Sequence, residues 1–148
     1  MKKTIILIII AIAAITANAK NFYETFENMP GITTVYVSKA MISLAGNLNM
    51  DEMDFNSLAS KIDGLWVVSA EGDKAAAVSA KAKETFKSSD YESLVKVNDG
   101  DEHVDISMKT GRDGKNECII NVSEPGEATV VILRGTFTLR DIMAASGK

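Results

Sequence analysis

The spacing of apolar residues changes partway along this 148-residue chain. Before Tyr91, most apolar side chains recur every three or four positions, as in amphipathic helices. Two exceptions are the β-branched, apolar runs at residues 32–37 and 65–70, which predict strands. The second run is apolar almost throughout, which is typical of a strand covered on both faces or nearly so. From Tyr91 onward apolar and polar residues alternate, so the chain is expected to end in a series of strands.

Two of the predicted helices lie near the N-terminus. The first carries Phe22, Tyr23 and Phe26 at helical spacing and stops at the turn sequence around Pro30. The second follows Ser38, whose hydroxyl is suited to cap a helix. The apolar face expected for this second helix consists of Met41, Leu44, Ala45 and Leu48. Core packing is the expected role of both apolar faces.

Two more helices are predicted between residues 51 and 87. The first begins at Asp51 or Asp54 and ends at Asp63-Gly64, with an acid at its start and a glycine at its end. The second is capped by Asp73 and runs to about Lys87. Its expected buried stripe consists of Ala75, Val78, Ala82 and Phe86. Small residues in that stripe would let the helix lie close to a sheet.

Four strands are predicted after Tyr91, separated by turns rich in Asp, Asn and Gly. They cover residues 91–97, 103–109, 117–123 and 128–137. Thr138 and Asp141 then form a capping-box pattern that opens a short last helix. The predicted fold class is therefore α+β: a mainly antiparallel sheet with a four-stranded C-terminal meander and helices packed on it.

The first nineteen residues resemble a secretory signal peptide. Lys2 and Lys3 precede the apolar stretch Ile5–Ile15, and Ala17-Asn18-Ala19 supplies the small residues of a cleavage site. Eleven apolar residues rise roughly 16 Å as a helix, too little to cross a bilayer core of about 30 Å. We therefore expect a signal peptide at 1–19 and a single exported domain at 20–148, periplasmic or secreted. No Cys follows the apolar stretch, so no lipid anchor is expected.

Composition and charge exclude several function classes. The chain is 46% hydrophobic and 24% charged, with one His, one Cys and a net charge of −4. Removal of Lys2 and Lys3 with the signal peptide leaves 14 basic and 20 acidic residues, a net charge of −6. No nucleic-acid partner is expected, because no basic stripe is present to displace counterions from phosphates. One His and one Cys cannot build a zinc site or a disulfide within the chain.

The candidate chemical residues each have an ordinary structural explanation. His103 shares a polar face with Asp105, Ser107 and Lys109, and this face is expected to be solvated. Cys118 alternates with Ile120 and Val122, which predicts a buried, unpaired thiol. Asp99, Asp101 and Glu102 crowd one turn, but Val104 stands where a calcium-binding EF-hand loop requires Gly. No catalytic, cofactor-binding or metal-binding residue is predicted.

Several stretches together resemble one known family. They are Gly31–Met41, Leu65–Gly72, Tyr91–Gly100 and Val130–Ile142. The family is domain-of-unknown-function family 4252, which comprises small exported proteins of Bacteroidetes-type Gram-negative bacteria. The resemblance implies an envelope origin and one compact α+β domain, but it brings no activity, cofactor or catalytic residue. Many members look like lipoproteins, from which this chain departs, and many are encoded beside extracytoplasmic-function sigma factors.

The leading functional hypothesis is an exported, non-enzymatic binding domain whose partner is another envelope protein. One sheet face or edge is expected to stay open to that partner. The ambiguous apolar residues lie near the two ends of the predicted domain and form either core or an interaction surface: Phe22, Tyr23, Phe26, Leu139, Ile142 and Met143. Docking on their own domain is the favoured alternative. Two rival functions are a carboxylate-only hydrolase of cell-wall sugars, which needs two facing carboxylates, and a regulatory partner in sigma and anti-sigma signalling.

Overall fold

The computed structural model describes residues 18–46, 60–87, 90–111 and 113–141. It has a mainly antiparallel sheet of six strands with a few short helices, which confirms the α+β class. The helices are α2 (Asn18–Phe26), α3 (Lys39–Gly46) and α5 (Asp73–Thr85). The strands are β1 (Ile32–Ser38), β2 (Ile62–Glu71), β3 (Glu92–Asp99), β4 (Glu102–Thr110), β5 (Asn116–Glu124) and β6 (Glu127–Gly135).

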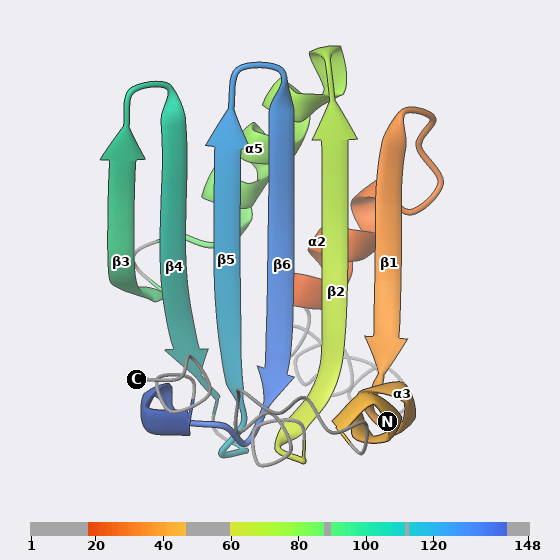
Figure 1. Ribbon diagram of the computed structural model, residues 1–148, viewed down its shortest axis with the longest axis vertical. Coiled ribbons are helices and arrows are strands. Elements are labelled where there is room, and N and C mark those ends of the chain that lie inside the picture. Colours follow the sequence, from red (N-terminus) through yellow and green to blue (C-terminus); the bar gives the residue numbers. More distant parts are fainter. Residues whose placement is uncertain (1–17, 47–59, 88–89, 112, 142–148) are drawn as a thin grey trace, which may run out of the picture.

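The strands lie in the order β1-β2-β6-β5-β4-β3, and every neighbouring pair is antiparallel (Figure 1). The four later strands follow one another across the sheet, and β6 then pairs with β2. A tight turn at Gly100 connects β3 to β4, and another at Gly126 connects β5 to β6. Both glycines have positive φ values, 60° and 76°, which a residue with a Cβ rarely adopts. The sheet therefore joins the two parts of the chain that differ in their apolar spacing.

Helices α2 and α5 cover one face of the sheet, which we call the helix face (Figure 1). The stripe predicted for α5 is present, because Ala75, Val78 and Ala82 are buried. Their small side chains bring α5 close to β2 and β6. The main core between the helices and the sheet contains Phe22, Phe26, Val68, Ala70, Tyr91, Ile119, Ala128, Val130 and Ile132 as well.

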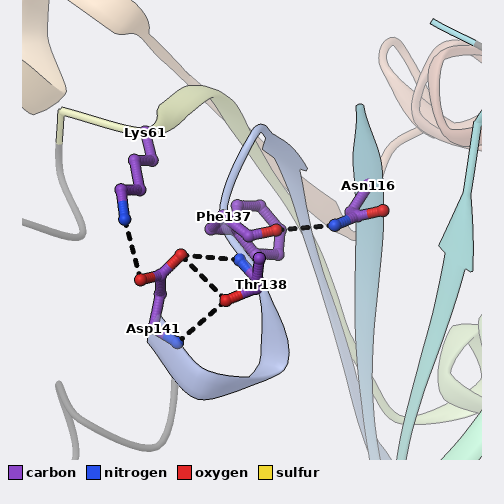
Figure 2. A network of polar contacts seen from close by, with 5 residues as sticks. All are labelled: Lys61, Asn116, Phe137, Thr138 and Asp141. Atoms are coloured by element: carbon purple, nitrogen blue, oxygen red, sulfur yellow. Dashed lines mark hydrogen bonds and ion pairs between the residues drawn. The ribbon is translucent and has the colours of Figure 1, made fainter. Parts of the chain in front are cut away.

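A second, smaller core lies on the opposite face. It consists of Ile42, Ile62, Cys118 and Phe137, with Val37, Leu65 and Leu133 among the half-buried residues around it. Phe137 is held by its backbone oxygen, which accepts a 2.6 Å hydrogen bond from the Asn116 side-chain nitrogen (Figure 2). Apart from this cluster at one end, α2 and α5 leave the opposite face uncovered (Figure 1).

The predicted capping box after β6 is confirmed (Figure 2). The Thr138 backbone N–H donates to Asp141 Oδ2 at 2.7 Å, and the Asp141 backbone N–H donates to Thr138 Oγ1 at 3.3 Å. The Lys61 ammonium, just before β2, lies 2.8 Å from Asp141 Oδ1. The capping pair therefore ties the start of β2 to the turn that follows β6.

Strand β2 begins earlier than the sequence pattern predicts. Ile62 pairs with Gly135 and Gly64 with Arg134, so the helix expected to end at Asp63-Gly64 is wrong over these residues. The rest of that expected helix, from Asp51 or Asp54 onward, lies outside the described residues. Gly64 is needed in the strand because a Cβ there would lie 2.7 Å from the Trp66 ring. A glycine that suggested a helix end instead makes room for an aromatic ring.

The buried face of α3 also differs from the prediction. Ile42 is buried, whereas Met41 and Leu44 are 57% and 59% exposed. The helix follows β1 directly, and its Met41 N–H lies 3.4 Å from the predicted cap, Ser38 Oγ. Because the helix starts directly after β1, the side chain of Ile42 packs with Ile62 and Phe137. Leu48, the last residue of the predicted face, lies outside the described residues.

The start of α5 requires a further correction. Asp73 is the first residue of the helix, and Gly72 occupies the cap position with no side-chain hydrogen bond. The chain leaves β2 and enters α5 through a positive φ of 68° at Gly72, which favours a glycine there. Asp73 therefore acts through its negative charge in the first turn, where it complements the helix dipole.

Candidate functional site

The aromatic residues of α2 are core residues. Phe22 and Phe26 are buried, and their rings meet at 5.2 Å in a T-shaped contact. Phe22 also lies 5.2 Å from the Phe86 ring at the end of α5. Tyr23 is half-buried against the same core. Phe22 and Phe26 are therefore not available as an interaction surface, and the helix docks on its own domain.

The residues near the other end of the domain are only partly described. Leu139 is exposed, while Ile142 and Met143 lie outside the described residues. Leu139 lines a cavity of about 470 Å³ with Met108, Lys109 and residues of β3. The lining of this cavity mixes polar and apolar residues, so it does not form a continuous apolar surface.

A continuous apolar surface does lie on the sheet face opposite α2 and α5, which we call the open face. Strand register places one β-branched residue from each strand in a single row across all six strands. That row is Val35, Val67, Val131, Ile120, Ile106 and Val95. The neighbouring row on one side, Val37, Leu65, Leu133, Cys118 and Met108, belongs to the second core. On the other side, Val122, Val104 and Val97 extend the apolar surface.

The two edge strands expose this row most. Val35 on β1 is 43% exposed, and Val95 and Val97 on β3 are 45% and 47% exposed. The 65–70 strand, predicted to be covered on both faces or nearly so, has no exposed residue, and its two faces differ in how far they are covered. Trp66, Val68 and Ala70 pack in the main core, but Val67 lies half-buried on the open face. The apolar pattern identified this surface as core, and no sequence signal distinguishes the two.

Carboxylates border the open face at one end of the sheet. Glu71 pairs with Glu127, Glu127 with Glu124, and Asp99 with Glu102. The pleat places them on the same side as the apolar rows, two residues further along each strand. The Glu127 carboxyl, by hydrogen bond and charge, raises the pKa of Glu124, and the Glu102 charge adds to this. We call these five residues the acidic border.

The carboxylates of the acidic border are spread along the strand ends. In the part of the chain that the structure describes, no group of three or more His, Cys, Asp or Glu side chains is arranged to hold a metal ion. The carboxylates follow the edge of a flat sheet, at the strand spacing of about 4.8 Å, and do not converge on one point. Their role is therefore to set the charge next to the apolar rows.

The predicted polar face of β4 lies on the helix side, next to α5. His103 is exposed, and its Nδ1 lies 2.6 Å from Asn98 Oδ1. Asp105 accepts a 3.2 Å hydrogen bond from Ser93. Ser107 is buried, so the expectation of a fully solvated face is wrong at this position. Helix α5 packs on β2, β6 and β5 and leaves this side of β4 as the wall of a groove.

Cys118 is buried and unpaired, which confirms its predicted environment. It pairs in register with Met108 on one side and Leu133 on the other. Burial raises the pKa of the thiol to about 11, because the thiolate would be poorly solvated there. A nucleophilic role is therefore disfavoured at neutral pH.

Comparison with known proteins gives one family match. The model of a domain of unknown function, DUF4252, matches residues 23–145. No curated protein matches the chain. No solved structure matches it either. Among the described residues, no helix combines the length and apolar character needed to span a membrane.

Proposed function

The chain belongs to the DUF4252 family, and we propose that it is an exported, non-enzymatic binding domain of the bacterial cell envelope that docks a partner protein on its open face. The observation that carries the proposal is the row of six β-branched side chains on the sheet face opposite α2 and α5. Large uncovered apolar surfaces mark interaction sites, because leaving them in water costs free energy.

The size of the open face suits a protein partner. Six strands about 4.8 Å apart, over four residues of about 3.4 Å each, give a flat area of roughly 400 Å². The side chains that stand above this plane increase the accessible area further. A standard interface buries about 800 Å² on each partner, so the apolar rows with their border supply most of one. A small molecule would cover only a fraction of such a flat surface.

The acidic border specifies the chemistry of the partner. The five carboxylates of the acidic border place negative charge along one end of the apolar rows. The complementary surface is an apolar patch with basic side chains along one end. Opposite charges at the rim of an interface steer association and fix the register of the two surfaces. A second copy stacked in the same orientation would bring its own acidic border against this one, and like charges at a rim oppose association, so we assign the face to a different protein.

Site-specific photo-crosslinking in the intact envelope tests this proposal. A photoreactive residue replaces Val35 or Val97, whose exposure leaves room for it, and Ala77 on the outer side of α5 is the matched control. We expect one partner adduct from both open-face positions and none from Ala77. Adducts from Ala77 alone, or adducts that contain only two copies of this chain, would contradict the proposal.

Charge reversal then tests the chemistry assigned to the partner. Glu102→Lys with Glu124→Lys reverses two exposed carboxylates of the acidic border, and Glu27→Lys changes an exposed residue beyond α2 as the control. Binding to the purified partner is expected to weaken about tenfold with the border variant and to depend on salt. An equal loss of affinity with Glu27→Lys would show that the net charge of the protein, and not the acidic border, determines binding.

Export itself is tested by the N-terminus of the mature protein. Cleavage after Ala19 would make Lys20 the first residue, as the signal-peptide pattern predicts. Mass spectrometry of the envelope fraction reads this terminus directly. An intact Met1 would reverse the proposed processing.

One observation favours the carboxylate hydrolase as a second candidate. Glu84 and Asp90 line a single cavity of about 340 Å³ beside α2 and α5, together with Lys81. Paired carboxylates across a cavity are the minimum for glycosidic bond cleavage. Release of soluble fragments from cell-wall glycan, abolished in Glu84→Gln and Asp90→Asn, would support this function. The sigma-factor alternative remains a prediction, tested by whether loss of the protein alters that regulon.

A further inference from the structure

A groove on the helix face, beside α5, is independent of the open face. Helix α5 packs mainly over β2, β6 and β5, and among the described helices none packs to a similar extent on the same side of β3 and β4. Two adjoining cavities of about 190 Å³ and 310 Å³ lie in the resulting groove. Four residues line both cavities: Lys83, Lys96, Asp105 and Asn121. The two spaces together are large enough for a ligand the size of a monosaccharide with one substituent.

Three lysines give this groove a positive charge. Lys83 and Lys87 come from the end of α5, and Lys96 comes from β3. The structure records no ion pair for any of the three with the residues it describes. Asp105 is the one carboxylate that lines the two cavities. A surplus of positive charge in a chain of net charge −4 makes this groove a place for an anion.

A polar atom in the groove lacks a partner. The Asn121 Oδ1 atom is buried and has no hydrogen-bond partner in the described structure. A buried acceptor left without a donor costs free energy, and a water molecule or a ligand hydroxyl can supply that donor. The lysines at the end of α5 also complement the helix dipole. That effect explains neither Lys96, which lies on a strand, nor the unsatisfied Asn121.

We propose that this groove binds a small anion that carries hydroxyl groups, such as a sugar phosphate or a sugar carboxylate. The lysine ammonium groups contact the phosphate or carboxylate, and a ligand hydroxyl donates to Asn121 Oδ1. Phe86 and Ile119 line the cavity of about 190 Å³ and supply an apolar wall for the ring of a sugar. The proposal does not depend on the open face, and either one can fail without the other.

Calorimetric titration at low ionic strength tests the site with four defined probes. These are glucose 6-phosphate, glucuronate, inorganic phosphate and uncharged glucose. We expect saturable binding of at least one of the two charged sugars, weaker binding of inorganic phosphate and none of glucose. The charged sugar that binds more tightly identifies the anionic group. Absence of saturable binding for both charged sugars would overturn the proposal.

Variants then locate the binding. Lys83→Gln with Lys96→Gln is expected to weaken binding at least tenfold, because two charged contacts are lost. Lys74→Gln, at the exposed start of the same helix, is the matched control and is expected to bind unchanged. Asn121→Ala should remove the preference for the sugar over inorganic phosphate. Binding that is insensitive to Lys83 and Lys96, or equally sensitive to Lys74, would overturn the assignment, and circular dichroism confirms that each variant is folded.

Discussion

Tyr91 and Glu117 form a buried polar pair at the border of the main core. The Tyr91 hydroxyl donates a 2.7 Å hydrogen bond to Glu117 Oε2, and both side chains are buried. The Arg134 Nε atom lies 4.0 Å from the other carboxylate oxygen. A carboxylate in this position depends on such partners, because it has lost most of its hydration. The pair therefore holds the start of β3 against β5, and this link needs both the hydroxyl and the carboxylate.

Removal of the Tyr91 hydroxyl is expected to destabilise the domain. Tyr91→Phe keeps the ring but leaves Glu117 Oε2 without this donor, which should cost about 1.5–3 kcal/mol of unfolding free energy. Urea denaturation measures the change, and Tyr23→Phe at a half-buried position is the matched control. A Tyr91→Phe variant as stable as the parent would show that the hydroxyl contributes nothing net.

The Cys118 thiol is expected to react slowly and to couple stability to alkaline pH. A bulky thiol reagent should label it only after unfolding, because the side chain is buried. Its pKa, raised by burial to about 11, lies above its value in the unfolded chain. Stability is therefore complete below the unfolded pKa of about 8.5 and falls as the pH rises toward 11, by at most about 1.4 kcal/mol per pH unit.

The control for this prediction is Cys118→Val, which keeps an apolar side chain at the site. Chemical denaturation at several pH values between 8 and 11 compares the two proteins. The difference in unfolding free energy between them should change with pH in this range. Parallel pH profiles, or fast labelling of the native thiol, would show that the thiol is accessible.

At the scale of elements, α2 contributes to the core through two aromatic rings. Phe22 is fully buried and contacts both Phe26 and Phe86. Phe22→Ala should lower the unfolding free energy by about 3–5 kcal/mol, because it removes a ring and leaves a cavity. Thermal denaturation measures the loss, and Asn21→Ala on the exposed side of the same helix is the control. A small effect of Phe22→Ala would mean that α2 is not part of the stable core.

The capping box after β6 is expected to make stability depend on acidic pH (Figure 2). The Lys61 ammonium, followed by the Thr138 hydrogen bonds, lowers the pKa of Asp141 below its usual value. A lowered pKa means that the stabilisation is present above the unfolded pKa of about 3.9 and is lost as the pH falls through the folded value. Asp141→Asn should therefore be less stable at neutral pH and should lose less stability below pH 4.

Thr138→Ala separates the cap from the ion pair. It removes the hydroxyl that accepts from the Asp141 N–H but leaves the Lys61 contact in place. Loss of an N-cap side chain typically costs about 1 kcal/mol. Its acid profile is expected to stay close to that of the parent protein in thermal melts. A Thr138→Ala profile identical to that of Asp141→Asn would assign the pH dependence to the cap.

At the scale of the whole molecule, the two faces of one sheet have different surroundings. The helix face is covered by α2 and α5 over most of its width, and beyond α5 it becomes a polar groove. The open face is apolar across all six strands and has carboxylates along one end. One sheet therefore presents the two surfaces to which we assign different ligands in our proposals, a protein on one side and a small anion on the other.

Chelation is expected to leave the stability of the whole domain unchanged. Asp99, Asp101 and Glu102 crowd one hairpin end, yet the described residues offer no group arranged around a metal. A metal bound to the native state would add stability by mass action, and EDTA would remove it. Melting temperatures with EDTA and with added calcium should therefore agree. A fall of several degrees in EDTA would show that the turn from Asp99 to Glu102 binds calcium.

The pattern of apolar residues determined most of the elements because it depends on local periodicity. Alternation after Tyr91 predicted β3 to β6, and helical spacing predicted α2 and α5 with their buried residues. The burial of Cys118 also followed from alternation, since Ile120 and Val122 follow it at every second position. Errors occurred where a residue type has two common uses. Gly64 suggested a helix end but provides space for Trp66, and Met41 suggested a buried face but is exposed.

What each face of the sheet contacts was decided only by the tertiary structure. An apolar strand residue shows the same alternation whether a helix, a partner or nothing covers it, so the sequence predicted one open face or edge without identifying which. The row from Val35 to Val95 depends on strand order and register, which join residues far apart in the chain. The groove depends on where α5 ends across the sheet, which brings Lys83 and Lys96 beside Asn121. Local periodicity thus determined the elements, and their packing determined which surfaces remain free to bind.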